Sequence, residues 1–560
     1  MTNKSFAFAL LSLVTVGLTG CKDYITELSP GTSLLEDFFI SGDAAKQCVT
    51  GCYEPMICEY NVTYCPEWFI GDVVSDDALK GGQTTNDMEV AYDMENWKTT
   101  STNELSYDRY KVSYMGIARC NLALKYIEPM KLDSTMDSVM KNRYLGEVHF
   151  LRAYYYFHLV RLFGGVPLSL QVEEQSDRWT LGRATTKDVY NQIIADLEFA
   201  NKTLWVRSKY PVEEMGRATK GAAQGLLQKV YLYMASPYWY NKHLTKDGIQ
   251  QSRQDLYKLS KQWGDSLFLS KEYDLVDDYE YNFTLLGENN IESVFEFQYT
   301  EVPWGDYGEA AGGHIGYTAG SFTQILIRSR SSQIGGGWGF NHPTYNLYNE
   351  FEAGDPRRDV TIYVPDPAMM DNVSEETYCG DPLLNNKYSM YRETADSKSG
   401  IGKWGYHQSR GPLNRDYMRL ADNYLMYAEA CLELNGDATT CIEYINKVRR
   451  RVSMPEYDPE NPYPITVNGK VITSPTVKQA LRHERRMELA MEAHRWFDLV
   501  RWSDETTGET VKAHMEAYQA TESDAAKSHL ATFELGKHEL FPIPQLEIER
   551  NTALVQNWGY

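Results

Sequence analysis

Two stretches of the sequence combine flat aromatic side chains with charged and amide side chains. They are residues 71–103, which include a Gly-Gly turn, and residues 300–345, which are rich in glycine and aromatic residues. Trp and Tyr can cover the weakly apolar face of a sugar ring, while carboxylates, amides and cations can hydrogen-bond its hydroxyl groups. Packing against neighbouring residues is the structural alternative for each side chain. The candidate sugar-binding residues are Asp72, Lys80, Trp97, Trp304, Tyr307 and Tyr317.

Motifs typical of enzymes are missing or incomplete. His483 and Glu484 begin like the HExxH motif of zinc proteases, but Met487 stands where the second histidine is required. The sequence has neither the nucleophile elbow of hydrolases nor a phosphate-binding P-loop. Carboxylates are plentiful enough for a glycosidase pair, but nothing singles out two of them. We therefore predict that the protein is not an enzyme and has no cofactor or metal.

Acidic and basic residues alternate within residues 482–502. On one helix this pattern is typical of an ion-pair network between packed helices. We predict structural roles for the tryptophans Trp496 and Trp502 of this segment, and also for Trp338. The charged residues of the pattern are Arg482, Glu484, Arg485, Arg486, Glu488, Glu492 and Arg495.

The N-terminus has the pattern of an export signal. Lys4 precedes an apolar run over residues 6–18, which is short for a membrane-spanning helix and typical of a signal-peptide core. The run ends in Leu-Thr-Gly before Cys21, which resembles a bacterial lipobox; an ordinary signal peptide is the alternative. We predict that residues 1–20 are removed, that Cys21 is acylated, and that residues 21–40 form a tether. Because no later apolar run reaches 18 residues, the lipid is the only membrane attachment that we expect.

The composition limits the class of protein. The chain has 560 residues, with 55 Lys and Arg against 77 Asp and Glu, which gives a formal net charge of −22. This acidic balance argues against a nucleic-acid-binding protein, which would carry a basic surface. With 42% hydrophobic and 24% charged residues, the chain is too apolar to be disordered. Its length indicates several hydrophobic cores or one large domain of stacked units.

The cysteine pattern fits an exported protein. No CxxC pair occurs, which argues against a structural zinc site. Cys48, Cys52, Cys58 and Cys65 cluster in sequence, and an oxidising compartment allows one or two disulfides among them.

Hydrophobic periodicity predicts helices in both halves of the chain. Apolar residues between 148 and 162 recur every three or four positions, and Gly164 follows as a stop signal. Thr185 and Asp188 are placed like a capping box at the start of another helix. Residues 420–448 read as two helices joined by an Asn-Gly-Asp turn, which is typical of a tetratricopeptide-type hairpin.

The middle of the chain has a different character. Residues 291–299 alternate in a period of two and predict a strand. We predict a mostly α domain over residues 41–560 with a few short strands. A helical scaffold over about 41–290 and 416–560 would flank a loop-rich insertion over about 291–415.

Several long segments together resemble the RagB/SusD family, the surface nutrient-binding lipoproteins of Bacteroidetes. The resemblance covers nearly all of the mature chain, with the segments in the family's order. The segments are residues 143–167 (RYLGEVHFLRAYYYFHLVRLFGGVP), 338–359, 417–451, 482–502 (RHERRMELAMEAHRWFDLVRW) and 540–560.

The resemblance implies a function and a fold. Members of the family bind oligosaccharides or polysaccharides and deliver them to a SusC-like TonB-dependent barrel in the outer membrane; some relatives bind peptides or other nutrients. Their fold is a single mostly α domain with tetratricopeptide-type helix pairs and a loop-rich ligand face. The Gly-Gly turn after Lys80 and the downstream Trp97 match a loop that lies on the ligand face of glycan-binding relatives. A surface glycoside hydrolase is the less favoured alternative.

Overall fold

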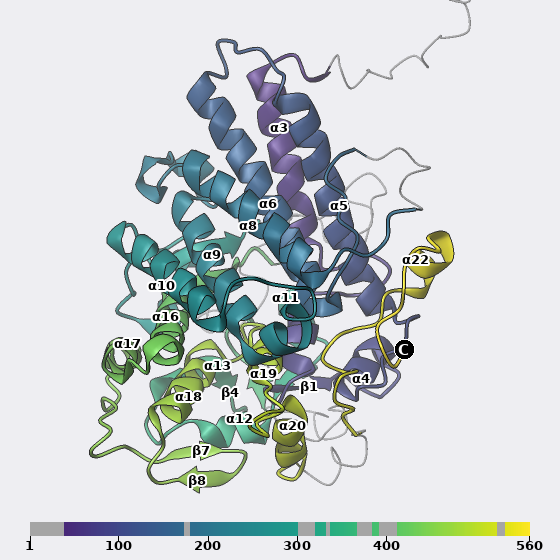
Figure 1. Cartoon of the computed structure of the whole chain (residues 1–560). Helices are drawn as coiled ribbons and strands as arrows, with labels where there is room; N and C mark the ends of the chain where they lie inside the picture. Colours follow the sequence, from purple (N-terminus) through teal and green to yellow (C-terminus); the bar gives the residue numbers. More distant parts are fainter. Residues whose placement is uncertain are drawn as a thin grey trace, which may run out of the picture.

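Helices dominate the computed structural model, which describes residues 38–172, 180–300, 320–331, 337–366, 383–390, 411–522 and 532–560. The long N-terminal helices lie at one end of the molecule and the later helices pack below them (Figure 1). The longer helices are α3 (Gly42–Tyr53), α5 (Glu104–Ile127), α6 (Ser138–Phe163), α8 (Thr186–Thr203), α9 (Lys220–Ala235), α10 (Arg253–Leu269), α16 (Leu420–Asn435), α17 (Ala438–Arg451) and α18 (Val477–Leu489).

Shorter elements fill the rest of the described chain. The short helices are α4 (Glu89–Glu95), α11 (Thr323–Ile327), α12 (Tyr345–Glu350), α13 (Pro356–Thr361), α19 (Arg495–Trp502), α20 (Val511–Gln519) and α22 (Gln545–Arg550). The strands form antiparallel pairs: β1 (Ala78–Gly81) with β3 (Phe340–Pro343), β2 (Ser293–Phe297) with β6 (Arg415–Arg419), β4 (Ile362–Tyr363) with β5 (Leu384–Asn385), and β7 (Ile465–Val467) with β8 (Lys470–Ile472). The prediction of a mostly α domain with a few short strands is confirmed.

Local signals in the sequence set the helix ends. The Thr185 hydroxyl accepts a hydrogen bond from the Asp188 backbone N–H at 3.1 Å and caps α8, as one half of the predicted capping box requires. The Asp188 carboxylate accepts from the Thr185 hydroxyl at 2.7 Å and not from its backbone N–H, so the second half of the box is not formed. Gly164 follows α6 with a φ of +72°, a conformation that glycine adopts without the steric cost that a Cβ brings. The predicted stop of α6 is therefore confirmed.

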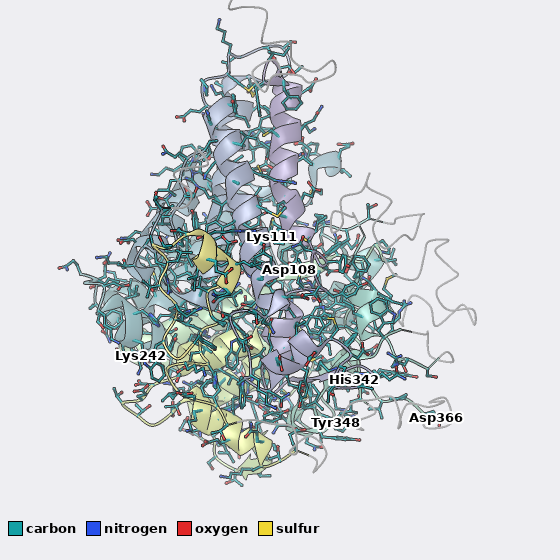
Figure 2. The ribbon with its side chains drawn as sticks, turned by 90° about the vertical axis from the view of Figure 1, so that its right-hand side faces the viewer. Asp108, Lys111, Lys242, His342, Tyr348 and Asp366 are labelled. Carbon is teal, nitrogen blue, oxygen red and sulfur yellow. The ribbon has the colours of Figure 1, made fainter. Side chains whose placement is uncertain are left out.

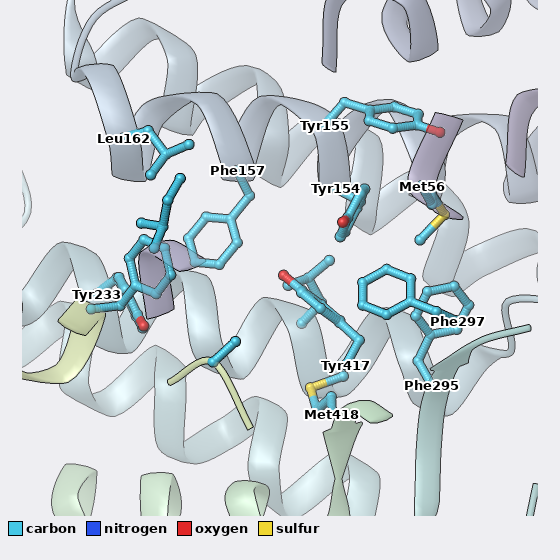
Figure 3. Close-up of a cluster of buried hydrophobic side chains, with 14 of the residues drawn as sticks. Met56, Tyr154, Tyr155, Phe157, Leu162, Tyr233, Phe295, Phe297, Tyr417 and Met418 are labelled. Carbon is cyan, nitrogen blue, oxygen red and sulfur yellow. The ribbon is translucent and has the colours of Figure 1, made fainter. Parts of the chain in front are cut away.

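The largest hydrophobic core forms around α6, which is buried on every side along its second half. In Figure 3, Tyr154 and Phe157 of α6 face Tyr417 and Phe297 across this core. The Tyr154 and Tyr417 rings lie 5.0 Å apart in an edge-to-face arrangement, which aromatic pairs prefer.

The predicted strand at residues 291–299 is confirmed as β2. It pairs with β6, so that Ser293 lies opposite Arg419 and Phe297 opposite Arg415. Both strands are buried along their whole length. This pair joins the end of the first helical region to the start of α16, so the two helical regions share one core.

The predicted tetratricopeptide-type hairpin is confirmed as α16 and α17. The chain turns between them at Gly436, which has a φ of +68°. Buried Leu425, Ala428 and Ile445 belong to a second, smaller core on this pair.

The predicted ion-pair network around α18 is also confirmed, and it is buried. Glu488 accepts hydrogen bonds from Arg419 at 2.6 Å and from Arg357 at 3.2 Å, and it also pairs with Arg451. Burial by itself would raise the pKa of Glu488, but these three guanidinium groups hold it well below its ordinary range. The network therefore joins α18 to β6, α13 and α17.

Candidate functional site

The β1–β3 pair brings the two sequence stretches with predicted sugar-binding residues together. Leu79 of β1 lies opposite His342 of β3, and the Gly82 N–H donates to the Gly339 carbonyl at 2.6 Å. A Cβ on Gly81 would lie 2.2 Å from the same carbonyl oxygen, so only glycine allows this approach. The Gly81-Gly82 turn at the end of β1 consequently lies against Gly339 and Phe340.

Four aromatic side chains form a cluster beside this turn, which we call the aromatic platform: Tyr60, Tyr64, Phe322 and Trp338. The Tyr64 ring lies 5.1 Å from the Trp338 ring at 78° and 4.7 Å from the Tyr60 ring at 46°. Phe322 is buried, and its ring packs edge-to-face against the Tyr64 ring with the centroids 5.4 Å apart. Tyr60, Tyr64 and Trp338 are half-buried and pack against the edge of the main hydrophobic core.

Polar side chains border the platform, and we call them the polar rim: Gln83, Asp87 and Arg330. Arg330 donates to the Trp338 carbonyl and to the Gln83 side-chain oxygen, both at 3.3 Å. It also lies 3.6 Å from an Asp87 carboxylate oxygen, and that carboxylate accepts from the Gln83 N–H at 2.9 Å. The rim therefore places an amide, a carboxylate and a guanidinium group next to the half-buried rings of the platform.

A buried carboxylate fixes the chain on either side of residues 301–319. Glu59 accepts hydrogen bonds from the Tyr299 hydroxyl at 3.1 Å and from the Ser321 hydroxyl at 2.9 Å. It also accepts from the backbone N–H of Phe322 and from the Thr323 hydroxyl. Glu59 thus holds Tyr299 and residues 321–323, which flank residues 301–319, next to the aromatic platform.

Helix α5 holds the loop that carries Tyr60 and Tyr64. Asp108 accepts hydrogen bonds from the backbone N–H groups of Val62 and Thr63, at 2.9 and 2.8 Å. Arg109 donates to the Cys65 carbonyl at 3.1 Å. Figure 2 shows this side of the molecule, with Asp108 labelled next to Lys111 on α5.

Two of the predicted sugar-binding residues have structural roles instead. The Lys80 ammonium is buried and donates to the carbonyls of Thr84 and Asp87, so it shapes the turn of the polar rim. Asp72 is also buried and accepts from the Ala493 N–H at 2.8 Å. Burial and the nearby Asp77 raise the pKa of Asp72 to about 7. The prediction that the Lys80 and Asp72 side chains face a ligand is therefore wrong, because both are buried and bonded within the fold.

Trp97 requires the same correction. Its side chain is only 6% exposed, and its ring packs edge-to-face against Phe533 at 5.1 Å. A ring covered in this way cannot stack on a sugar while the fold stays intact. Trp97 belongs to the main hydrophobic core.

The three other predicted residues, Trp304, Tyr307 and Tyr317, lie outside the described residues, and their role stays a prediction. The sequence analysis named neither Tyr60 nor Tyr64, which the structure places beside Trp338. Trp338, for which we predicted a structural role, packs half-buried against the main hydrophobic core. The only local signal for the tyrosines was their position between Cys58 and Cys65. Trp496 and Trp502 are buried, as predicted.

Models of two related families match the chain. A model described as the SusD family matches residues 230–560, and a model described as starch-binding associating with outer membrane matches residues 44–232. Together they span nearly all of the described chain.

Relatives and solved structures agree with these matches. A SusD-like protein of Bacteroides ovatus is 26% identical over 514 residues, which is 88% of this chain and 82% of the relative. SusD-like protein P38 of Formosa agariphila is 26% identical over 516 residues, covering 89% and 91% of the two chains.

Two solved structures share the fold over most of the chain. A laminarin-binding SusD-like protein superimposes with a TM-score of 0.70 at 25% identity and covers 93% of this chain and all of its own. Surface glycan-binding protein A from Bacteroides thetaiotaomicron, solved with laminarihexaose, has a TM-score of 0.70 at 21% identity, and the match covers 92% and 99% of the two chains. Since the SusD model alone matches more than half of the residues, and fold and relatives agree with it, this chain is a member of the SusD family.

Proposed function

We propose that the protein is a cell-surface lipoprotein that captures an oligosaccharide or polysaccharide and delivers it to a SusC-like TonB-dependent transporter. The observation that carries the glycan-binding part is the aromatic platform with its polar rim. Half-buried aromatic rings beside an amide, a carboxylate and a guanidinium group are the side-chain types that match the apolar face and the hydroxyl groups of a sugar. Trp304, Tyr307 and Tyr317 are proposed to extend this surface, since Glu59 holds the flanking residues next to it.

The angles between the rings suggest the shape of the glycan. Because Tyr64 and Trp338 meet at 78°, a flat, ribbon-like glycan stacks on only one of them, whereas a chain that bends between residues contacts both. Laminarin is a glucan with such a bent chain, and two structural neighbours are named for binding laminarin or laminarihexaose. We therefore propose a bent glucan as the first ligand to test.

Binding is tested by titrating the purified mature chain with laminarin, starch, a flat β-1,4-linked glucan and a peptide mixture. We expect saturable binding to a bent glucan, with no increase in reducing ends during prolonged incubation. Binding to the peptide mixture and to none of the glycans would show that the ligand is a peptide. Release of reducing ends would show that the protein is a glycoside hydrolase.

Membrane attachment is proposed to depend on Cys21. Within the described residues, no helix combines the length and apolarity needed to cross a bilayer. Cys21→Ala should therefore move the protein from the outer-membrane fraction into the soluble exported fraction, because an acyl chain supplies most of the affinity for lipid. Immunoblots of both fractions from a strain lacking the barrel partner measure the effect. If the variant stays in the membrane there, another segment anchors the protein.

The transporter is proposed to bind the protein as a stable partner. A lid that closes a barrel must bury a wide interface, so the complex should survive mild detergent. Affinity purification of the acylated protein from solubilised outer membranes should recover a TonB-dependent barrel in near-equal amount, measured by mass spectrometry. Elution of the acylated protein alone would remove the delivery step from the proposal and leave glycan binding untouched.

A further inference from the structure

Two buried cysteines, both free thiols in this structure, lie at the base of the loop that carries Tyr60 and Tyr64. Tyr60 and Tyr64 form an antiparallel bridge, and the Cys65 N–H donates to the Glu59 carbonyl at 2.8 Å. The two ends of the loop therefore run side by side, and Cys58 and Cys65 are neighbours at its base.

The two thiols point into this base. The Cys58 sulfur lies 3.4 Å from the Tyr60 carbonyl oxygen, and the Cys65 sulfur lies 3.9 Å from the Cys58 carbonyl oxygen. The side chains are 2% and 0% exposed. A hydrogen bond from Cys65, and the nearby Arg109, lower the pKa of Cys58, while the same contact and burial raise the pKa of Cys65. The pair thus consists of two buried thiols in contact with each other at the base of the loop.

We propose that Cys58 and Cys65 form a disulfide that closes the base of the loop and holds the two tyrosines of the aromatic platform in place. This inference rests on the proposed surface location, because exported proteins meet oxidants that the cytoplasm lacks. The covalent link would fix Tyr60 and Tyr64 against Phe322 and Trp338 before a ligand arrives, so less ordering is required on binding.

The oxidant is the disulfide of a thiol–disulfide oxidoreductase. The Cys58 thiolate attacks one sulfur of that disulfide, and the other sulfur leaves as a thiolate. The Cys65 thiolate then attacks the Cys58 sulfur and releases the oxidoreductase as a dithiol, which takes up the two protons and the two electrons. One S–S bond breaks and one forms. Because both sulfurs are buried in the folded chain, the exchange takes place before the loop packs against α5.

Three other cysteines form a separate group on α3 and α5. The Cys52 thiol contacts the Cys48 carbonyl at 3.3 Å, and Cys120 lies beside it. Cys48 and Cys52 lie four residues apart on α3, one helical turn from each other. This group supplies the competing pairings that the experiment must separate from Cys58–Cys65.

Chymotryptic peptide mapping separates these pairings. The full chain is purified from the exported fraction, denatured, alkylated without reductant and digested. Cleavage after Tyr53, Tyr60, Tyr64 and Trp68 places Cys58 in residues 54–60 and Cys65 in residues 65–68. We expect these two peptides to be joined and to separate on reduction. Recovery of both as alkylated thiols, or either joined to Cys48, Cys52 or Cys120, would overturn the proposal.

A second measurement follows the loop in the folded protein. Cys58→Ser with Cys65→Ser should speed chymotryptic cleavage at Tyr60 and Tyr64 about tenfold, because the closed loop opens less often than a free one. Cys431→Ser with Cys441→Ser is the matched control and should leave that rate unchanged. An equal rate in parent and Cys58/Cys65 variant would contradict the proposal, and should that variant not fold, the peptide map of the parent decides. Neither measurement involves a glycan, so failure here leaves the proposed function standing.

Discussion

Replacing Arg419 with methionine should lower the free energy of unfolding by about 3–5 kcal/mol. Arg419 is 1% exposed and donates to Glu292 at 2.8 Å, to Glu488 at 2.6 Å and to Glu492 at 2.8 Å. Methionine fills similar space but leaves three buried carboxylates short of positive charge, which is why the cost is large. Urea unfolding followed by circular dichroism measures the change.

Two further variants distinguish the loss of a buried charge from the loss of any arginine. Arg450→Met removes an exposed arginine that pairs with Glu456 at 3.0 Å, and it should cost less than about 1 kcal/mol. Arg419→Lys keeps the positive charge but loses the planar guanidinium group and some of its hydrogen bonds. Its free energy of unfolding should therefore lie between those of the parent and Arg419→Met. If Arg419→Met were as stable as Arg450→Met, the buried network would have no role in stability.

Truncation of Tyr64 or Trp338 to alanine should weaken glycan binding about 5- to 30-fold for each ring. Each ring stacked on a sugar removes about 50–80 Å² of apolar surface from water, which is worth about 1–2 kcal/mol at about 25 cal/mol per Å². Because the two rings contact each other, their effects should not add fully, and we expect the double variant to lose about 30- to 100-fold. Titration calorimetry with laminarihexaose measures the affinities.

Two tryptophan variants serve as controls for the aromatic platform. Trp558 is 67% exposed and lies outside the platform, so Trp558→Ala should bind like the parent. Trp97 is a core residue, so Trp97→Ala should lower the free energy of unfolding by about 3–5 kcal/mol. Parent-like affinity in Tyr64→Ala and Trp338→Ala would move the binding site away from the platform, and Trp304→Ala would then test the neighbouring stretch.

The helical scaffold could be predicted because its signals are local. The apolar spacing within residues 148–162, the stop at Gly164 and the cap at Thr185 act over one or two helical turns, and each is found where the sequence places it. The alternation in residues 291–299 predicted β2 for the same reason. Its partner β6 could not be predicted, because strand pairing over more than a hundred residues leaves no local pattern.

The charge pattern of α18 was predictable as a network but not in its connections. Alternation of Glu and Arg on one helix indicates ion pairs with neighbouring helices. The actual partners include Arg357 and Arg419, which lie far from α18 in sequence, on α13 and β6. Which charges become buried depends on how these distant elements pack, and this decides whether a pair contributes little or several kcal/mol.

The fold class, the family and the two stretches that meet at the candidate site could all be predicted from residue patterns. Which side chains of these stretches become buried depends on the packing of distant segments. Pairing of β1 with β3 turns Lys80 inward onto the carbonyls of its own turn, and Phe533 covers Trp97. Trp338, two residues before β3, is half-buried beside Tyr64. Residue type and spacing specify what a side chain could bind, but its exposure is set by distant segments that pack over it.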